Sequence, residues 1–221
     1  MIILIDNGHG YDTAGKCSPD KSLREYKWAR EVAQRIASKL TSKGYDARLL
    51  VPEENDISLK ERCRRANAIY DKAKAEGDSC IFISIHANAA GADGKWKTAG
   101  GWCVYTSPGK TKADELATDL WDASQTHLAP YIDAFAGKKE AGCYDKRQVP
   151  VRADWSDGDP DYEARFYVLV HTKCPAVLTE SLFQDNKSDV EFMLSAEGMG
   201  AIVNLHVAGI LKYITDNTNK A

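Results

Sequence analysis

Two histidines and two glutamates, far apart in the chain, are the side chains whose types could act together in catalysis: His9, Glu25, His86 and Glu180. Two imidazoles and one carboxylate are typical ligands of a catalytic zinc ion, which keeps a fourth position open for water. A second carboxylate that does not bind the metal could take up a proton and return it. These residue types therefore indicate metal-assisted hydrolysis.

His9 lies between two glycines in Asp6-Asn7-Gly8-His9-Gly10. Glycines allow a tight turn and a close backbone approach, which would aim the imidazole into a site. Asp6 is near enough in the chain to fix the tautomer of a histidine ligand. Taken alone, however, a Gly-His-Gly segment is better explained by a surface histidine.

Each of the other three residues also has a structural explanation. His86 ends an apolar run between small residues, where it could bond a backbone carbonyl instead of a metal. Glu25 opens a segment with helical periodicity, where an acid favours the helix dipole. Glu180 follows another apolar run and could pair with an arginine at a sheet edge.

The remaining three histidines are weaker candidates. His206 falls on the apolar stripe of the last helical segment and is predicted to be a core histidine. His127 lies near a predicted helix end, where it could bond terminal carbonyls. His171, just before Thr172-Lys173-Cys174-Pro175, is the reserve ligand if Glu25 does not bind the metal.

Apolar runs and helical stripes alternate along the chain, and this alternation predicts the elements that position these residues. Buried strands are expected at 2–5, 47–51, 80–85, 102–106 and 176–179. Helical stripes cover 29–40, 59–73, 116–123 and 199–213; Gly44 ends the first, and Ser58 with Glu61 caps the second. The pattern predicts an α/β fold, with a mostly parallel twisted sheet of about five to six strands and helices on both faces.

In such sheets the functional groups gather beyond the carboxyl ends of the strands. His9, His86 and Glu180 follow the first, third and last predicted strands, so we expect them at one edge. Without a Pro/Gly/Ser-rich linker, we predict one catalytic domain over 1–216 and a polar tail over 217–221. Segment 137–161, which includes Asp145 and Arg147, is predicted to be a surface excursion that sets fine specificity.

Charge and composition exclude several classes of protein. The formal net charge of -3 argues against a nucleic-acid-binding surface, and the basic cluster Lys60, Arg62, Arg64 and Arg65 is predicted to be a solvated helix face. No run approaches the roughly 18 apolar residues of a membrane span. The first apolar run is too short for a secretion signal, so we expect a protein that is cytoplasmic until it is released, or one whose signal has been removed. We also expect a monomer.

The six cysteines include no C-x-x-C pair. Cys80 and Cys103 fall in predicted strands, and Cys63 falls on a helical stripe. Buried, reduced thiols are therefore expected.

Taken together in this order, the motifs resemble the zinc N-acetylmuramoyl-L-alanine amidases of the amidase 3 family. The resemblance runs from Ile2 to about Ile214 and is carried by Asp12, Glu25, Asn186 and the segments 5–10, 44–47, 58–62, 66–67, 82–89, 100–105 and 175–183. Two positions depart from the pattern: Val51-Pro52, where the family often has Thr-Arg, and Asn7. Neither is a proposed ligand, so the departures bear on subfamily and substrate variant.

The resemblance implies a role for each residue in the cluster. His9, Glu25 and His86 would bind Zn²⁺, and Glu180 would be the catalytic base; Asn88 and Asn186 are candidate supporting or substrate residues. The implied reaction is cleavage of the amide bond between the lactyl group of N-acetylmuramic acid and L-alanine in peptidoglycan, by an autolysin or a phage-type endolysin. Two alternatives stay open: a zinc peptidase with the same site, and a catalytically silent wall-binding domain.

Overall fold

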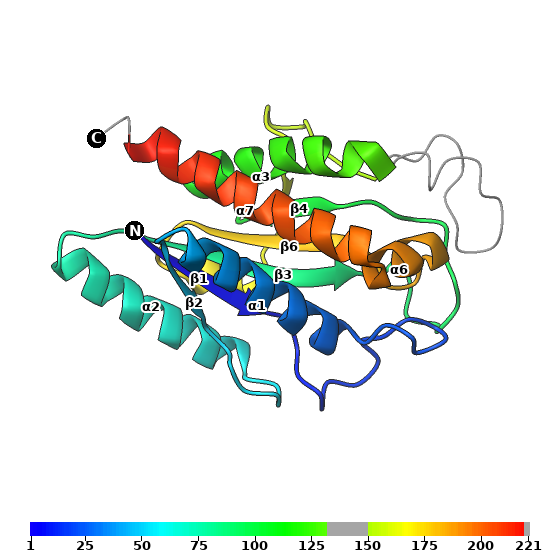
Figure 1. Cartoon of the computed structure of the whole chain (residues 1–221). Coiled ribbons are helices and arrows are strands. Elements are labelled where there is room, and N and C mark those ends of the chain that lie inside the picture. Colours follow the sequence, from blue (N-terminus) through cyan, green and yellow to red (C-terminus); the bar gives the residue numbers. More distant parts are fainter. Residues whose placement is uncertain (132–149, 219–221) are drawn as a thin grey trace.

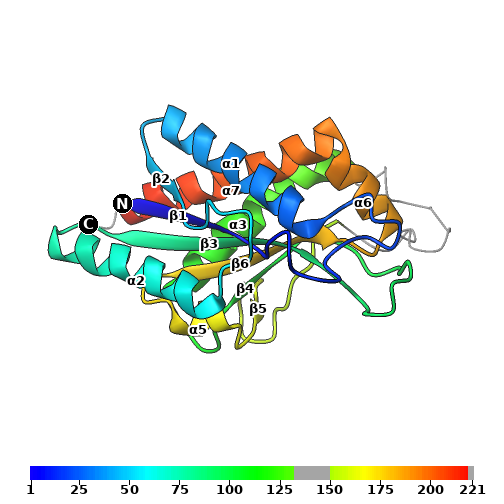
Figure 2. The ribbon, with the colours of Figure 1, turned by 90° about the horizontal axis from the view of Figure 1, so that it is seen from below.

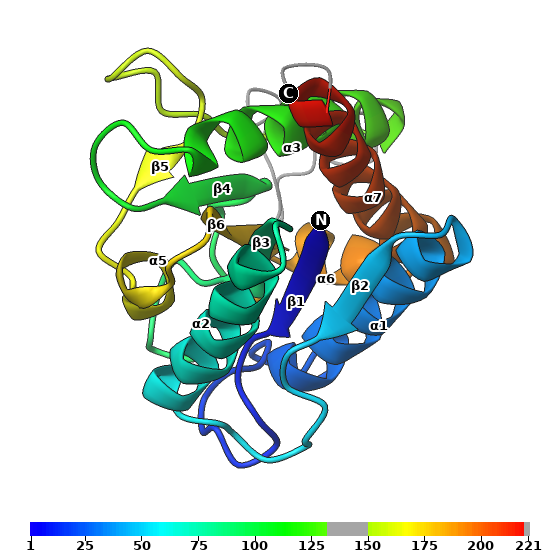
Figure 3. The ribbon, with the colours of Figure 1, turned by 90° about the vertical axis from the view of Figure 1, so that its left-hand side faces the viewer.

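Six strands form one sheet in the order β2-β1-β3-β6-β4-β5 (Figure 3). The computed structural model describes residues 1–131 and 150–218. Neighbouring strands are parallel except at the junction of β4 with β6, which is antiparallel. The strands are β1 (Ile2–Asn7), β2 (Asp46–Leu49), β3 (Cys80–Asn88), β4 (Cys103–Thr106), β5 (Tyr162–Glu163) and β6 (Ala176–Phe183).

Helices cover both faces of the sheet (Figures 1 and 2). Two packed layers of apolar side chains result, one beneath α1, α3, α6 and α7 and a smaller one beneath α2 and α5. This arrangement confirms the predicted α/β fold with a mostly parallel sheet. The helices are α1 (Glu25–Ser42), α2 (Leu59–Ala75), α3 (Ala113–Leu128), the short 3₁₀ helix η1 (Ala129–Tyr131), α5 (Tyr167–His171), α6 (Lys187–Leu194) and α7 (Ala196–Thr218).

The four predicted helical stripes correspond to α1, α2, α3 and α7. Ser58 is the N-cap of α2, where its hydroxyl accepts a hydrogen bond from the backbone N–H of Glu61 at 3.3 Å. The Glu61 carboxylate instead pairs with Arg64 and Arg65. Gly44 follows the end of α1 with a φ of 88°, a conformation that glycine adopts without strain.

Four predicted strand ends were wrong. β1 continues to Asn7, and β2 already ends at Leu49. β3 continues to Asn88 and β6 to Phe183, so His86 and Glu180 lie within strands and do not follow them. The short strand β5 was also missing from the prediction.

Two other predicted segments, the tail 217–221 and the excursion 137–161, lie partly outside the residues that the structure describes. Residues 217 and 218 of the predicted tail form the last turn of α7, and 219–221 lie outside the described residues. Of the excursion 137–161, positions 137–149, with Asp145, Lys146 and Arg147, lie outside them as well. Residues 150–161 are mostly irregular, and Val151 forms a single bridge with Trp102.

The prediction of buried thiols is confirmed for four of the five described cysteines. Cys63, Cys80, Cys103 and Cys174 are buried free thiols, and Cys17 is a half-buried one. Cys143 lies outside the described residues. No single helix in 1–131 or 150–218 is long and apolar enough to cross a membrane; α6 and α7 meet that criterion only as a pair bent by 83°.

Candidate active site

His9, Glu25 and His86 meet at one point although they come from a loop, a helix and a strand. Glu25 Oε1 lies 3.3 Å from His9 Nε2 and 3.1 Å from His86 Nδ1. The two imidazole rings are perpendicular, with centroids 5.0 Å apart. One ligand atom from each residue lies within 4.8 Å of the others, and this is the only such group of three among the described residues.

The loop that carries His9 is held in an uncommon conformation. His9 has a φ of 60°, in the left-handed region that non-glycine residues rarely adopt. Its carbonyl oxygen accepts hydrogen bonds from Arg30 Nη1 at 3.0 Å and Arg62 Nη2 at 3.4 Å. A Cβ at Gly8 would lie 2.3 Å from the His86 ring, and one at Gly10 only 2.0 Å from the backbone nitrogen of Asp56. Both glycines are therefore required for the loop to lie against the cluster.

Glu25 is fixed from several sides and is 1% exposed. Its Oε1 accepts a hydrogen bond from the Ala87 backbone N–H at 3.0 Å, and its Oε2 accepts one from Gln184 Nε2 at 3.0 Å. Burial raises the pKa of this carboxyl, but the hydrogen bonds from His86 and His9 outweigh burial and hold the pKa far below its usual range. Glu25 is therefore an ionised carboxylate aimed at two imidazoles.

His86 has a hydrogen-bond partner at each ring nitrogen. Nδ1 faces Glu25, and Nε2 lies 3.1 Å from Ser84 Oγ. Burial lowers the pKa of His86, but the hydrogen bond to Glu25 and its charge raise it by more. An imidazole between two acceptors in this way favours a positive charge at the centre of the cluster.

Glu180 lies beside His86 on the neighbouring strand. The two residues are Cα partners in the parallel pairing of β3 with β6, so their side chains leave the same face of the sheet. Burial raises the pKa of Glu180 to about 7, although the His86 charge opposes the shift. Its Oε2 is buried without a hydrogen-bond partner among the described residues. A carboxyl in this state can exchange a proton near neutral pH.

A buried arginine supports the cluster, contrary to the predicted solvated helix face. Arg62 is 1% exposed and donates to Asp6 Oδ1 and the Asn7 carbonyl oxygen, both at 2.6 Å. Asp6 Oδ2 accepts from Ser84 Oγ at 2.6 Å, and Ser84 contacts His86. Asp6 thus reaches His86 through Ser84 and does not contact His9 directly. In the sequence, Arg62 stands among other charged residues of the same helix, and nothing there distinguishes it from a residue on the solvent-exposed face.

The cluster opens into a cavity of about 250 Å³ that also contains Glu180. Lys16 lines the cavity, and its charge acts on Glu180. The cavity also has an apolar wall from the start of α2 and from α5 with its N-cap, where Leu59, Phe166 and Tyr167 are exposed to solvent. The site therefore combines a polar end with an apolar wall that could contact a substrate.

The other predicted site residues do not belong to the group of three ligand residues. Asn186 caps α6 by accepting from the Asp189 N–H at 3.2 Å and is fully buried. Asn88 is half-buried, and its Oδ1 accepts from the Ala89 N–H at 2.8 Å. His171 ends α5 and stacks on Tyr167, with ring centroids 3.9 Å apart.

His206 is a core histidine, as predicted. It is fully buried, and its two nitrogens contact the Ile202 carbonyl oxygen and the Thr179 hydroxyl. His127 lies in the last turn of α3.

Two residues that hold the proposed ligands, Gln184 at Glu25 and Ser84 at His86, were not predicted. Ser84 could have been found, because residues two apart on a strand face the same side and His86 was already a candidate. Gln184 follows the end of β6, where no periodicity marks which way a side chain points.

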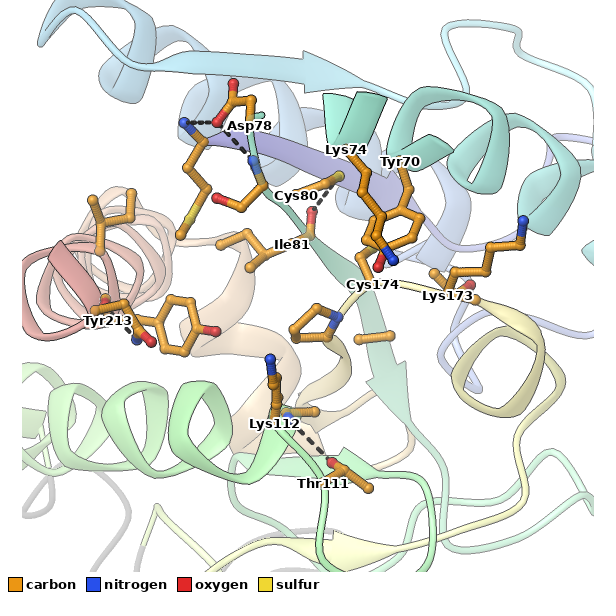
Figure 4. A pocket seen from close by; sticks show the side chains of 18 of the residues that line it. Tyr70, Lys74, Asp78, Cys80, Ile81, Thr111, Lys112, Lys173, Cys174 and Tyr213 are labelled. Carbon is orange, nitrogen blue, oxygen red and sulfur yellow. Dashed lines mark hydrogen bonds and ion pairs between the residues drawn. The ribbon is translucent and has the colours of Figure 1, made fainter. Parts of the chain in front are cut away.

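A cavity of about 950 Å³ lies at the other edge of the sheet around Cys80, Cys174 and Tyr213 (Figure 4). Cys80 begins β3, whereas His86 lies near its end. None of the four candidate catalytic residues lines this cavity. The smaller cavity is therefore the candidate active site.

A family model described as N-acetylmuramoyl-L-alanine amidase (Amidase_3) matches residues 3–212. The chain belongs to this family. The resemblance in the motifs is confirmed, and family membership makes the chain an amide hydrolase.

Relatives of known name agree with the family. The endolysin of Bacillus phage SPP1 is 26% identical over 215 residues, which cover 96% of this chain and 66% of the endolysin. The amidase CwlM of Bacillus licheniformis is 25% identical over 221 residues, or 99% of this chain and 71% of CwlM. The chain thus spans about two thirds of the length of each relative.

The N-acetylmuramoyl-L-alanine amidase of Clostridium difficile 630 has a solved structure with the same fold. The TM-score is 0.70 at 22% identity, and the match covers 97% of this chain and 96% of that one. That amidase therefore shares the arrangement of sheet and helices described above.

Proposed function

We propose that this chain is a zinc-dependent N-acetylmuramoyl-L-alanine amidase that cleaves the bond between the lactyl group of N-acetylmuramic acid and L-alanine in peptidoglycan. The observation that carries the proposal is the meeting of His9, Glu25 and His86 at the end of a cavity that His9, His86 and Glu180 line. The family assignment supports the reaction class, and the names of the relatives support a peptidoglycan substrate. Its site of action would be the cell wall.

The residues of the cluster fit a catalytic zinc ion. Two imidazoles and one carboxylate are the donor set of such a site, and three ligands leave room for a reacting molecule. The favoured positive charge on His86 also marks a position where a bound cation could replace a proton. Gln184 and the Ala87 N–H hold the Glu25 carboxylate in place, as partners of metal ligands commonly do.

When bound, a zinc ion would acidify a water molecule and polarise the substrate carbonyl. Glu180 would take the proton of the attacking water on its free Oε2 and then give it to the L-alanine amine as that group leaves. Its raised pKa suits both transfers, because a group that titrates near 7 can accept and donate at neutral pH. The apolar wall from α5 would position the substrate and exclude water.

Product analysis on purified peptidoglycan tests the proposal. Amidase action releases intact stem peptides whose new free amine belongs to L-alanine, whereas a zinc peptidase would expose amines within the stem. A chelator should abolish the release, and added zinc should restore it. Full activity of metal-free protein, or new amines only on other residues, would contradict the proposal; wall binding without any release would favour a silent binding domain.

A further inference from the structure

One arginine, at the described end of the excursion 137–161, lies on the same face of the sheet as the candidate catalytic residues. Trp102 and Val151 form a parallel bridge, and the Arg152 N–H donates to the Trp102 carbonyl oxygen at 2.8 Å. Arg152 therefore lies beside Cys103, the residue that follows Trp102 and begins β4. Cys103 is in turn the Cα partner of Glu180.

These pairings place three functional side chains in one row across the sheet. His86 on β3 is the Cα partner of Glu180 on β6, and Arg152 lies two strand positions further along, beyond β4. Residues that are neighbours in register point to the same face of a sheet. At the usual spacing of strands, the backbones of Glu180 and Arg152 lie about 10 Å apart. The row thus leads from a proposed zinc ligand through the proposed base to a cation.

The guanidinium group of Arg152 is held near the active-site edge of the sheet. Its Nη1 donates to the Gly100 carbonyl oxygen at 3.2 Å, and its central carbon lies 5.4 Å from the centre of the Phe183 ring. Phe183 ends β6, three residues past Glu180, and is the Cα partner of Asn88. Arg152 is exposed, and within 1–131 and 150–218 no acidic side chain forms a salt bridge with it. A cation in this state can bind an anion from solution.

Aromatic rings connect the surroundings of Arg152 with the cavity of the candidate active site. The ring of Tyr105 on β4 lies 5.3 Å from that of Tyr162 and 5.1 Å from that of Phe166. Phe166 lines the cavity, and the Tyr162 hydroxyl donates to the carbonyl oxygen of Ala153, the neighbour of Arg152, at 3.3 Å. A peptide that leaves the cavity along this wall would therefore reach the arginine.

We propose that Arg152 binds the free α-carboxylate of the second residue of the stem peptide, an inference that rests on the proposed amidase function. In peptidoglycan this residue is a D-glutamate linked through its side chain, so its α-carboxyl is either free or amidated. The row matches the order of groups in the substrate. The reacting carbonyl belongs at the ligands, the L-alanine amine at Glu180, and the carboxylate two residues, or about 7 Å, further along. Arginine binds a carboxylate through two parallel hydrogen bonds, which an amide cannot both accept.

Two disaccharide muropeptides that differ only in this α-carboxyl, free or amidated, test the inference with the zinc-loaded chain. The wild type should cleave the free form with a kcat/KM at least about tenfold higher, through a lower KM. Arg152→Gln should bring the ratio of the two kcat/KM values to about one by raising the KM of the free form alone. Arg152→Lys should keep part of the preference, because it keeps the charge but not the planar group.

Arg35→Gln is a matched control, since Arg35 is an exposed arginine on α1 that pairs with Glu31. This variant should keep the wild-type ratio. The Arg152 variants should fold, because the backbone of this residue makes the hydrogen bonds to Trp102 and to the Trp121 indole. Unfolding temperature and zinc content should therefore match the wild type. Should Arg152→Gln fail to fold, Arg152→Lys decides, and an unchanged ratio in that variant would overturn the inference.

The outcomes separate this inference from the proposed function. If the wild type releases an L-alanine amine from neither muropeptide, the amidase proposal fails, and the inference fails with it. If it cleaves both with equal kcat/KM, or if the preference survives in Arg152→Gln, only the inference is overturned. Lys16 is the cation that lines the cavity itself, so a preference lost in Lys16→Gln and kept in Arg152→Gln would assign the carboxylate to Lys16 instead.

Discussion

Glu25 is the residue on which the proposed ligand set depends most. Alone it resembles any acid in the first turn of a helix, and nothing in its local sequence separates a ligand from a residue that favours the helix dipole. Its burial and its two imidazole partners are tertiary features. The four candidate catalytic residues could be proposed from the sequence, but only the folded structure shows that they meet at one point.

Replacing Glu25 with Ala should therefore remove the metal, because two histidines hold zinc poorly. We expect zinc content to fall from about one ion per chain to well below half, with loss of amide cleavage. Glu31→Ala, an exposed acid on the same helix, should keep both. Metal content measured on dialysed protein decides the question, and a Glu25→Ala protein that keeps its zinc would make His171 the next residue to test.

At the scale of the elements, the sequence predicted the start of each central strand better than its end. The apolar runs of β3 and β6 end before the strands do, because polar side chains there alternate with buried apolar ones. In β3, Ser84 and His86 face the site, while Ile85 and Ala87 pack in the core. An apolar run ends where this alternation begins, although the backbone pairing continues. The short elements β5, α5 and α6 have too few residues to show a periodicity, so they were not predicted.

The contact between α7 and β6 gives a prediction about pH. His206 is neutral, with its Nδ1–H donating to the Ile202 carbonyl oxygen at 2.7 Å and its Nε2 accepting from Thr179 Oγ1 at 2.9 Å. Burial lowers the pKa of His206 from 6.5 to about 4. Between these values the unfolded chain binds a proton that the folded chain does not, so the free energy of unfolding should fall as the pH falls through this window, by up to about 3 kcal/mol.

His206→Gln isolates this effect because glutamine does not titrate. The stability advantage of the wild type over the variant, measured by urea unfolding, should narrow as the pH is lowered from 7 to 4. Stability curves that run parallel across this range would show that His206 is not the group responsible.

At the scale of the whole molecule, the alternation of strands and helices was enough to predict the fold class. It could not give the order of the strands or the reversed direction of β4 and β5, because both depend on contacts between segments far apart in the sequence. The apolar wall from α5 was also not predicted, since Phe166 and Tyr167 belong to no run or stripe.

We also predict that the chain is a monomer. Several of its exposed large apolar residues, Leu59, Phe166 and Tyr167 among them, line the candidate active site and so are accounted for without a second copy. Sedimentation equilibrium should give a mass near 24.4 kDa that does not change with concentration. A mass near twice that value would contradict this prediction.

Glu180→Gln provides the most direct test of the central claim, that three residues hold zinc while a fourth moves the proton. The substitution keeps the size of the side chain but removes its basicity. Zinc content should stay near one ion per chain, while the rate of amide cleavage should fall by at least about 10²–10⁴-fold. Zinc content and cleavage of purified peptidoglycan should be measured on the same preparation: loss of zinc would make Glu180 a ligand, and retained cleavage would show that another group is the base.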